Sequence, residues 1–270
     1  MKEEQFLDKK ELRGLNQELV SKIITKVKEE NKELVKKLEA KEGNVKSKEF
    51  KELKKIIRKK LRVIHGSFAV KKISDYKKKK ILDLIKKDPS NADLALDIHR
   101  SCRERLPYYQ ELYDFIKIKD SVLDIGCGLN GFSYPYFKKN IFYKGIDVNE
   151  EELSFVKQYF EQEKINGVLE NLDLTNKDNI EKIGLESEKF ECVFLLKTLD
   201  TLESIERNIS EKIMRVIKSK KIVVSFPTRT LGGKKLISSE RTWFKKIKKE
   251  NYNTSTYEID NEIFYIFNKK

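Results

Sequence analysis

The sequence predicts an α/β fold with a mostly parallel sheet, preceded by an all-helical N-terminal domain. Two observations support this prediction. In the first hundred residues apolar side chains recur at helical spacing, whereas from residue 121 onward short apolar runs alternate with helical stretches. Strands that alternate with helices favour a parallel sheet with short crossover connections. We place the boundary between the two domains at residues 98 and 99.

The N-terminal domain is expected to contain four helices. Two long ones are predicted over residues 15–40 and 47–68, where apolar residues recur every three or four positions. A third helix, over 74–87, should stop near the following Asp-Pro pair, because proline disfavours continuation of a helix. A fourth should begin after Ser90 or Asn91 and extend through residues 92–106.

Positive charge is concentrated in the N-terminal part of the chain. The chain has 58 Lys+Arg against 44 Asp+Glu, a net charge of +14. Residues 1–100 hold 29 Lys+Arg and 17 Asp+Glu, so they carry +12 of that total. Such a surface attracts polyanions, because each neutralised phosphate releases a counterion. A single lysine run, for example Lys77 to Lys80, is equally well explained as a solvated helix face, but the concentration of charge favours RNA docking. The residues assigned to RNA binding here are Lys54, Lys55, Arg58, Lys59, Lys60 and Arg62.

Other classes of protein are disfavoured by composition. No run approaches the roughly 20 apolar residues that span a bilayer, and the first ten residues lack the apolar core of a secretion signal. The three cysteines are odd in number and far apart, which fits neither a disulfide framework nor a zinc site. We expect a cytoplasmic, monomeric protein that uses neither a metal nor a membrane.

The C-terminal domain, residues 99–270, shows five strand candidates followed by a hairpin. A polar turn at Asp260 and Asn261 separates the two strands of the hairpin, which lies within 255–267. Five strands plus a hairpin make a seven-stranded sheet, which is the layout of a Rossmann-like class I methyltransferase fold. The five candidate strands cover residues 121–125, 141–147, 167–173, 190–196 and 221–227.

The stretch "VLDIGCGLNGF" follows the first strand and contains a G-x-G turn. Gly126 and Gly128 allow the backbone to turn sharply and to approach a ligand closely, with Asp124 before them and Cys127 between them. A G-x-G alone is weak support for a cofactor site. The third glycine of the dinucleotide fingerprint is absent, which favours S-adenosylmethionine over a ligand with a pyrophosphate.

Two acids at the ends of later strands support this assignment. Asp147 ends the second strand, where a carboxylate can accept hydrogen bonds from both ribose hydroxyls of a cofactor. Asp173, followed by Leu174, ends the third, where the carboxylate or the adjacent backbone can meet the adenine amino group. A helix cap or turn explains Asp173 equally well.

Four motifs resemble a known family. The runs "IHRSCRERLPYYQELYDFI", "SVLDIGCGLN", "VFLLKTL" and "VVSFPTRTLGGKK" resemble the aminoglycoside-resistance 16S rRNA methyltransferases, and the resemblance covers most of the chain. That family methylates N7 of the guanine at position 1405 in the decoding site. The resemblance therefore implies S-adenosylmethionine as the cofactor and 16S rRNA within the 30S subunit as the partner. One departure is Gly131-Phe132-Ser133, where the family commonly has a proline followed by small or apolar residues.

The resemblance also implies roles for individual residues. Arg105 would bind the methionine carboxylate of the cofactor, and His99 lies on the same segment, although a structural role for this histidine is favoured. Lys197 would lie near the methyl-transfer centre, and Phe226 would stack on the extruded guanine. Because guanine N7 has a lone pair and no proton, no general base is needed. Phosphate contacts would come from Arg229, which also borders the pocket, and from Lys234 and Lys235.

Two other functions remain open at this stage. The chain could be an RNA-binding protein with a degenerate methyltransferase fold, which the intact glycines and acids disfavour. It could instead methylate another rRNA position or a small molecule. A small-molecule substrate would not explain the positive charge of the N-terminal domain.

Overall fold

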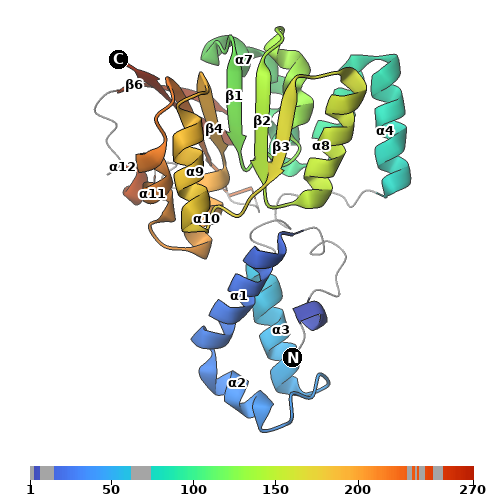
Figure 1. The fold of residues 1–270 in the computed structure, drawn as a ribbon, viewed down its shortest axis with the longest axis vertical. Helices are drawn as coiled ribbons and strands as arrows, with labels where there is room; N and C mark the ends of the chain where they lie inside the picture. The colour runs from blue at the N-terminus through green and yellow to red at the C-terminus, as the bar shows by residue number, and fades with distance from the viewer. Residues whose placement is uncertain are drawn as a thin grey trace. The chain divides into compact units, whose positions relative to one another are not determined.

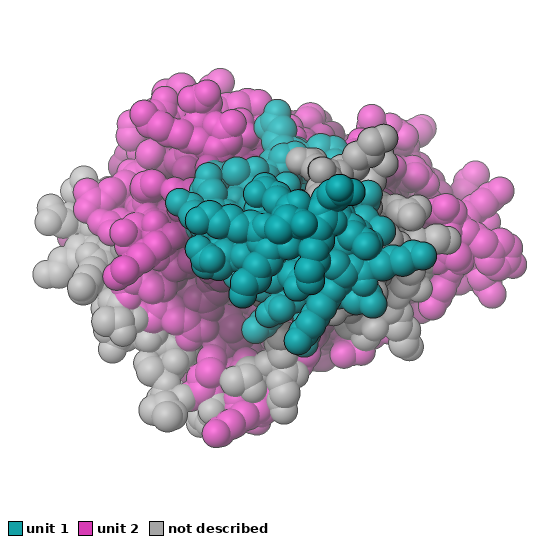
Figure 2. Space-filling view, turned by 90° about the horizontal axis from the view of Figure 1, so that it is seen from below, with its two compact units in different colours: residues 1–67 teal, residues 68–270 magenta. Residues whose placement is uncertain are grey.

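The computed structural model describes residues 3–6, 15–61, 74–229, 233, 234, 236, 241–245 and 252–270. The chain divides into two compact units, residues 1–67 and residues 68–270, which Figure 2 shows in different colours. Each unit is described by itself below.

The described part of the first unit consists of helices joined by short turns. Asn16 caps the start of α1 (Gln17–Glu30), because its side chain accepts a hydrogen bond from the backbone N–H of Leu19 (3.2 Å). The predicted helix over 15–40 is two helices, because the Asn31 side chain bonds the carbonyl of Val27 (2.8 Å) and ends the first one. The elements are η1 (Glu3–Phe6), α1 (Gln17–Glu30), α2 (Lys32–Glu39) and α3 (Lys48–Leu61).

The second unit is built on a seven-stranded sheet in the order β3-β2-β1-β4-β5-β7-β6 (Figure 1). The first five strands are parallel, and β7 runs antiparallel to both β5 and β6. The predicted mostly parallel sheet and terminal hairpin are confirmed, although β3 ends two residues earlier and β4 begins two residues later than predicted. The strands are β1 (Ser121–Ile125), β2 (Phe142–Asp147), β3 (Gly167–Asn171), β4 (Cys192–Leu196), β5 (Lys221–Pro227), β6 (Tyr252–Ile259) and β7 (Glu262–Lys269).

Helices cover both faces of this sheet and bury a separate apolar cluster on each. On one face, residues such as Phe155 and Tyr109 pack against Val122 and Phe194. On the other, Ile183 and Ile213 belong to the cluster that contains Leu123 and Val193. Adjacent strand residues such as 122 and 123 therefore contribute to opposite faces. The helices are α4 (Asp75–Lys87), η4 (Pro89–Ala92), α5 (Asp93–Leu96), α6 (Arg100–Arg105), η5 (Leu106–Tyr108), α7 (Tyr109–Ile116), η6 (Asn130–Phe137), α8 (Glu150–Glu163), α9 (Lys177–Ser187), α10 (Thr198–Ile205), α11 (Ile209–Val216) and α12 (Thr242–Lys245).

Two helical segments differ from the prediction. The expected helix over 92–106 is broken at His99, whose extended backbone (φ −96°, ψ 123°) starts a new helix, α6. The segment between β1 and β2 is a 3-10 helix, η6, with Pro135 inside it.

Residues 75–98 belong to the second unit, whereas the predicted boundary places them in the N-terminal domain. Ile81 and Ile85 are buried in the cluster on one sheet face, and the Gln162 side chain of α8 donates to the carbonyl of Leu82 (3.0 Å). The apolar face of α4 is therefore used to cover the sheet. No helix in the described ranges is long and apolar enough to span a membrane.

Candidate functional site

The turn between β1 and η6, residues 126–128, is called the glycine turn below. The backbone N–H groups of Gly126 and Cys127 both donate to the carbonyl of Ile146 (2.7 and 3.1 Å), which fastens the turn to β2. Gly126 has φ +74°, and a Cβ placed on it would lie 2.5 Å from Oγ1 of Thr198. No other residue type fits this position without strain.

Asp147, the acid at the end of β2, is hydrogen-bonded to the last residue of the glycine turn. Its Oδ2 accepts a hydrogen bond from the backbone N–H of Gly128 (2.9 Å), and its Oδ1 accepts one from that of Asn149 (2.9 Å). The structure thus brings together the two sequence motifs that predicted a cofactor site, the G-x-G and the acid at the end of the second strand.

Asp124 lies fully buried beneath the glycine turn. Its Oδ2 accepts hydrogen bonds from the Tyr143 hydroxyl (2.6 Å) and from the Asn130 amide (2.7 Å). Its Oδ1 is also buried and has no hydrogen-bond partner among the residues that the structure describes. Burial raises the pKa of Asp124 to about 6, and the two hydrogen bonds partly oppose this shift. A buried carboxylate oxygen without a donor is a natural position for a cationic ligand group.

Arg105 and Lys197 converge on one buried carboxylate, that of Glu262. Nε of Arg105 lies 3.1 and 3.0 Å from the two Glu262 oxygens, and Nζ of Lys197 lies 3.2 Å from one of them. Lys197 also pairs with Glu104 (2.7 Å), and the Ser225 hydroxyl donates to Glu262. Arg105, Lys197 and Glu262 are 2%, 6% and 0% exposed, so each charge depends on the others for compensation.

This cluster joins distant segments at one edge of the sheet. Arg105 ends α6, Lys197 follows β4, and Glu262 begins β7. Lys197 has a left-handed backbone (φ 57°), and its N–H bonds the hydroxyl of Ser225 at the end of β5 (3.0 Å). Arg105 also points Nη1 toward the amide oxygen of Asn130 (3.4 Å), and Asn130 bonds Asp124, so the cluster extends to the glycine turn.

The segment that departs from the family pattern, Gly131-Phe132-Ser133, packs tightly against α8. Phe132 is fully buried, with its ring centroid 4.7 Å from those of Phe155 and Tyr159. A Cβ at Gly131 would lie 2.5 Å from Cγ1 of Val156. Gly131 and Phe132 are therefore accommodated by packing against α8.

Two further cofactor candidates are His99, which lies beside the glycine turn, and Cys127, which is part of it. The His99 ring is near Gly128, since Nε2 would lie 3.2 Å from a Cβ there, and its Nδ1 contacts Sγ of Cys102 (3.6 Å). Cys127 is buried, and burial raises the pKa of its thiol well above the ordinary value. Its side chain lies against β2 at Gly145, which indicates a packing role for the thiol.

Asp173 and Leu174 lie after β3, beyond its last residue. The Asp173 carboxylate accepts hydrogen bonds from the N–H and the hydroxyl of Thr175 (both 2.8 Å), and its carbonyl accepts one from Asn179 (2.8 Å). Leu174 is buried in the α9 side cluster. Asp173 is therefore explained as a turn residue, because both oxygens of its carboxylate already accept hydrogen bonds from Thr175.

Phe226 lies apart from the other predicted catalytic residues. Its ring is fully buried among Phe244, Trp243 and Tyr265, at centroid distances of 4.9, 5.8 and 6.1 Å. Ser225 faces the cluster of Glu262, so the adjacent Phe226 faces the other side of the sheet. This placement is that of a core residue and not of a residue that lines the cofactor edge of the sheet.

The predicted phosphate contacts of the C-terminal domain lie after β5. Arg229 is exposed and its Nη1 donates to the carbonyl of Gly233 (3.3 Å), and Lys234 is also exposed. Lys235 falls outside the described residues.

The predicted RNA contacts on α3 divide into two groups. Lys55 and Lys59 are exposed on the face opposite the buried apolar residues. Three others are engaged within the unit: Lys54 lies over the Phe50 ring (5.6 Å), Nε of Arg58 donates to the carbonyl of Phe6 (3.3 Å), and Lys60 pairs with Glu30. Arg62 falls outside the described residues.

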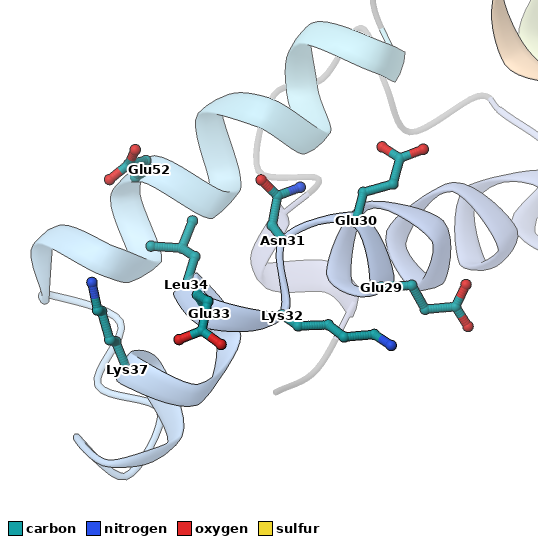
Figure 3. Close-up of a pocket in the computed structure, with 8 residues that line it drawn as sticks. All are labelled: Glu29, Glu30, Asn31, Lys32, Glu33, Leu34, Lys37 and Glu52. Atoms are coloured by element: carbon teal, nitrogen blue, oxygen red, sulfur yellow. The ribbon is translucent and has the colours of Figure 1, made fainter.

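An open pocket of about 560 Å³ lies between α1, α2 and α3 (Figure 3). Four carboxylates and two lysines line it, so this side of the unit is poorly suited to phosphate. Its lining residues are Glu29, Glu30, Asn31, Lys32, Glu33, Leu34, Lys37 and Glu52. The described ranges also contain no group of His, Cys, Asp and Glu side chains arranged to hold a metal ion.

A family model described as "Ribosomal RNA methyltransferase (FmrO)" matches residues 29–264. The chain belongs to this family. A relative from Micromonospora echinospora, named 16S rRNA (guanine(1405)-N(7))-methyltransferase, is 26% identical over 187 residues, which are 65% of this chain and 65% of that protein. The match therefore covers somewhat less than two thirds of that relative's length.

Solved structures share the fold over almost the whole chain. The 16S rRNA methyltransferase RmtF, in complex with S-adenosyl-L-homocysteine, superposes with a TM-score of 0.75 at 22% identity, covering 99% of this chain and 96% of that one. The 16S rRNA methylase RmtB gives a TM-score of 0.70 at 20% identity, covering 99% and 97%. These likenesses confirm the predicted α/β fold with its mostly parallel sheet.

The members of the site that reasoning from the sequence missed are Glu262, Asn130, Glu104 and Ser225. Glu262 directly follows the predicted hairpin turn and precedes the apolar run "IFYIF", so a turn acid explains it adequately. The sequence does not mark this role, because the burial of Arg105 and Lys197 and their contacts with Glu262 are seen only in the structure.

Proposed function

We propose that this member of the rRNA methyltransferase family transfers a methyl group from S-adenosylmethionine to N7 of the decoding-site guanine of 16S rRNA, position 1405, within the 30S subunit. The observation that carries the proposal is the glycine turn: it is hydrogen-bonded to Asp147 and follows Asp124, whose buried Oδ1 has no hydrogen-bond partner among the described residues. Such methylation would give the cell aminoglycoside resistance, as the family resemblance implies.

The polar groups at this edge fit S-adenosylmethionine, whose sulfonium supplies the methyl group when it is bound. Asp147 would hold the ribose hydroxyls, and Oδ1 of Asp124 would accept a hydrogen bond from the ammonium of the methionine moiety. Gly126 gives the glycine turn its left-handed backbone and its close packing against Thr198. His99 and Cys127 line the same turn and would shape the pocket.

Arg105 would bind the methionine carboxylate while Glu262 holds its guanidinium in place. The guanidinium has five N–H donors, of which Nε serves Glu262 and Nη1 is directed at Asn130. Within the described residues Nη2 makes no hydrogen bond, so it can serve a carboxylate without breaking the buried pair. Lys197, paired with Glu104, would border the methyl-transfer centre, and Asp173 and Leu174 would border the adenine.

In this reaction the protein aligns guanine N7 with the methyl group of the cofactor and excludes water. Guanine N7 attacks with its own lone pair and loses no proton, so no side chain needs to act as a base. The chain's residues would orient the cofactor at the carboxyl edge of the sheet. Arg229 and Lys234, with Lys235, would contact phosphates around the extruded nucleotide.

The pKa of Asp124 predicts the pH dependence of cofactor binding. Because burial raises this pKa to about 6, the carboxylate gains its charge as the pH rises through 6. Affinity for S-adenosylmethionine, measured by calorimetry, should rise from about pH 5 to about pH 7, because a cationic ammonium favours the ionised acid. In Asp124→Asn the profile should be flat, with affinity at pH 7 lower by about 10- to 100-fold.

The stability of the unliganded protein should change with pH in the opposite direction, falling as the pH rises. A raised pKa in the folded state stabilises the fold below the ordinary pKa of about 4, and this stabilisation is lost as the pH rises through 6. If the affinity of the wild type for S-adenosylmethionine is constant between about pH 5 and about pH 7, the Asp124 carboxylate has no role in binding the cofactor.

The first unit is proposed to dock on rRNA through the exposed lysines of α3. Lys48, Lys55 and Lys59 are exposed along the face opposite Leu53 and Ile57, flanked by Lys51. Lys55→Glu combined with Lys59→Glu should weaken 30S binding and reduce the slope of log affinity against log salt by about 2, since each phosphate contact contributes about 1. Lys32→Glu with Lys37→Glu, at the acidic pocket, is the matched control. Equal binding by the two double variants would contradict this docking face.

The proposed activity is tested by adding purified 30S subunits and isotopically labelled S-adenosylmethionine. We expect label in 16S rRNA, and loss of it with Asp147→Ala, which should also weaken cofactor binding in calorimetry. No cofactor binding at high micromolar concentration would favour the RNA-binding protein with a degenerate methyltransferase fold. Cofactor binding without transfer to 30S subunits would instead favour a small-molecule substrate.

A further inference from the structure

The outward face of α4 carries several exposed lysines that the site above does not use. Ile81, Leu82 and Ile85 point into the sheet cluster, so Tyr76 and Lys80 lie on the opposite face at i and i+4 spacing. The Tyr76 side chain is 79% exposed. A large aromatic side chain with this much exposed surface is unusual on a helix that otherwise follows an amphipathic pattern.

Positive charge surrounds this tyrosine. Lys77, Lys79 and Lys80 are exposed, and Lys86 and Lys87 extend the charge to the end of the helix. Lys78 pairs with Asp75 (3.5 Å), whereas none of those five lysines forms an ion pair with any residue that the structure describes. Asp83 is the acidic side chain of α4 that shares the outward face, so the face carries a clear net positive charge.

The first turns of α4 lie near the cofactor edge of the sheet. α4 packs along α8, and Lys78 is close enough to Glu152 to lower the pKa of that half-buried carboxyl, which desolvation raises to about 8 overall. Glu152 lies in the first turn of α8 beside the glycine turn, since its Oε2 would lie 3.3 Å from a Cβ on Gly128. Figure 1 shows α4 and α8 side by side, next to β3.

We propose that Tyr76, Lys77, Lys79 and Lys80, here named the α4 surface, form an RNA-binding surface on the methyltransferase unit itself. The inference rests on the proposed function and adds to it a second contact, separate from the α3 lysines of the first unit. The lysines would bind phosphates flanking the target nucleotide, and the Tyr76 ring would stack on an unpaired base or a ribose.

The composition of the surface favours RNA over a protein partner. A protein interface is depleted in lysine at its centre and buries aromatic residues among apolar neighbours. Here the aromatic ring stands alone among ammonium groups, which is the combination that single-stranded or distorted RNA binds through its phosphates and base faces. A protein partner on the 30S subunit is an outcome that the experiment separates.

The test compares two charge-reversal variants of equal size. The first carries Lys77→Glu, Lys79→Glu and Lys80→Glu. The control carries Lys119→Glu, Lys139→Glu and Lys189→Glu, three exposed lysines in the loops before β1, β2 and β4, at the opposite edge of the sheet. For each, affinity for 30S subunits is measured against salt concentration, and affinity for S-adenosylmethionine is measured by calorimetry.

We expect the α4 variant to bind 30S subunits at least tenfold more weakly than the control, with a salt slope reduced by about 2 to 3. Tyr76→Ala should weaken binding severalfold without changing the salt slope, and Tyr76→Phe should restore the affinity. Unchanged cofactor affinity in every variant would show that the fold is intact, and Lys→Gln replacements serve the same purpose if the reversals fail to fold.

The outcomes separate this inference from the proposed function. If the wild type methylates 30S subunits and the α4 variant binds them as tightly as the control, the α4 surface is overturned and the proposed function stands. If weakened binding is independent of salt, the contact is to ribosomal protein and the RNA assignment is overturned. If the wild type neither binds nor methylates 30S subunits, the proposed function fails, and the α4 surface with it.

Discussion

Glu262→Ala should reduce the free energy of unfolding by about 3–5 kcal/mol, the cost of breaking a buried ion pair by removing one partner. The substitution leaves the guanidinium of Arg105 buried beside Asn130 without a carboxylate. Lys197 keeps Glu104 as a partner, so the larger part of the loss comes from Arg105. Chemical denaturation followed by circular dichroism measures this change.

Glu258→Ala is the matched control, because Glu258 is an exposed acid in the same hairpin. It should change the free energy of unfolding by less than about 0.5 kcal/mol. Glu262→Gln, which keeps the shape and removes the charge, should fall between the two. If Glu262→Ala were as stable as Glu258→Ala, Glu262 would not be the partner on which the two buried cations depend.

Gly126→Ala should both destabilise the protein and abolish measurable cofactor binding. The new Cβ would require a left-handed alanine, at a cost of about 1–2 kcal/mol. It would also displace Thr198, whose hydroxyl donates to the carbonyl of Ile125 (2.9 Å), at a further cost of about 1 kcal/mol. Calorimetric titration with S-adenosylmethionine and a denaturation curve measure the two effects.

Two companion variants separate the clash from the backbone strain. Gly128→Ala should cost less, because a Cβ there meets only the ends of the His99 and Glu152 side chains, at 3.2 and 3.3 Å. Thr198→Ala in the Gly126→Ala background removes the clashing atoms, so the two changes should cost less together than their sum. Strict additivity would show that Thr198 does not limit the space at the glycine turn.

Much of the fold was predictable because the strands are short, apolar and separated by clear polar stretches. The N-terminal helices and the domain boundary were harder. Asn31 divides one apolar pattern into two helices, and a hydrophobic pattern alone does not reveal such a break. The apolar face of α4 shows that the helix packs on something, but local periodicity does not say which domain provides the partner surface.

The site was predictable where a motif carries its own geometry. The G-x-G turn and the acid at the end of β2 meet because parallel strands end at one edge of a sheet. Phe226 shows the opposite case: strand alternation places it on the face away from Ser225 and Glu262, and its aromatic partners come from distant parts of the chain. The pairing of Arg105 with Glu262 joins residues at opposite ends of the second unit, which no local signal reveals.

The most direct test of the central claim is to map the methyl mark on 16S rRNA after purified 30S subunits are incubated with this protein and S-adenosylmethionine. Mass mapping of nuclease fragments, combined with primer extension after cleavage at 7-methylguanine, locates the modified nucleotide. We predict a single N7 mark on the decoding-site guanine at position 1405, absent with Asp147→Ala. A mark on any other nucleotide, or none on subunits that a known methyltransferase of the family modifies, would contradict the account.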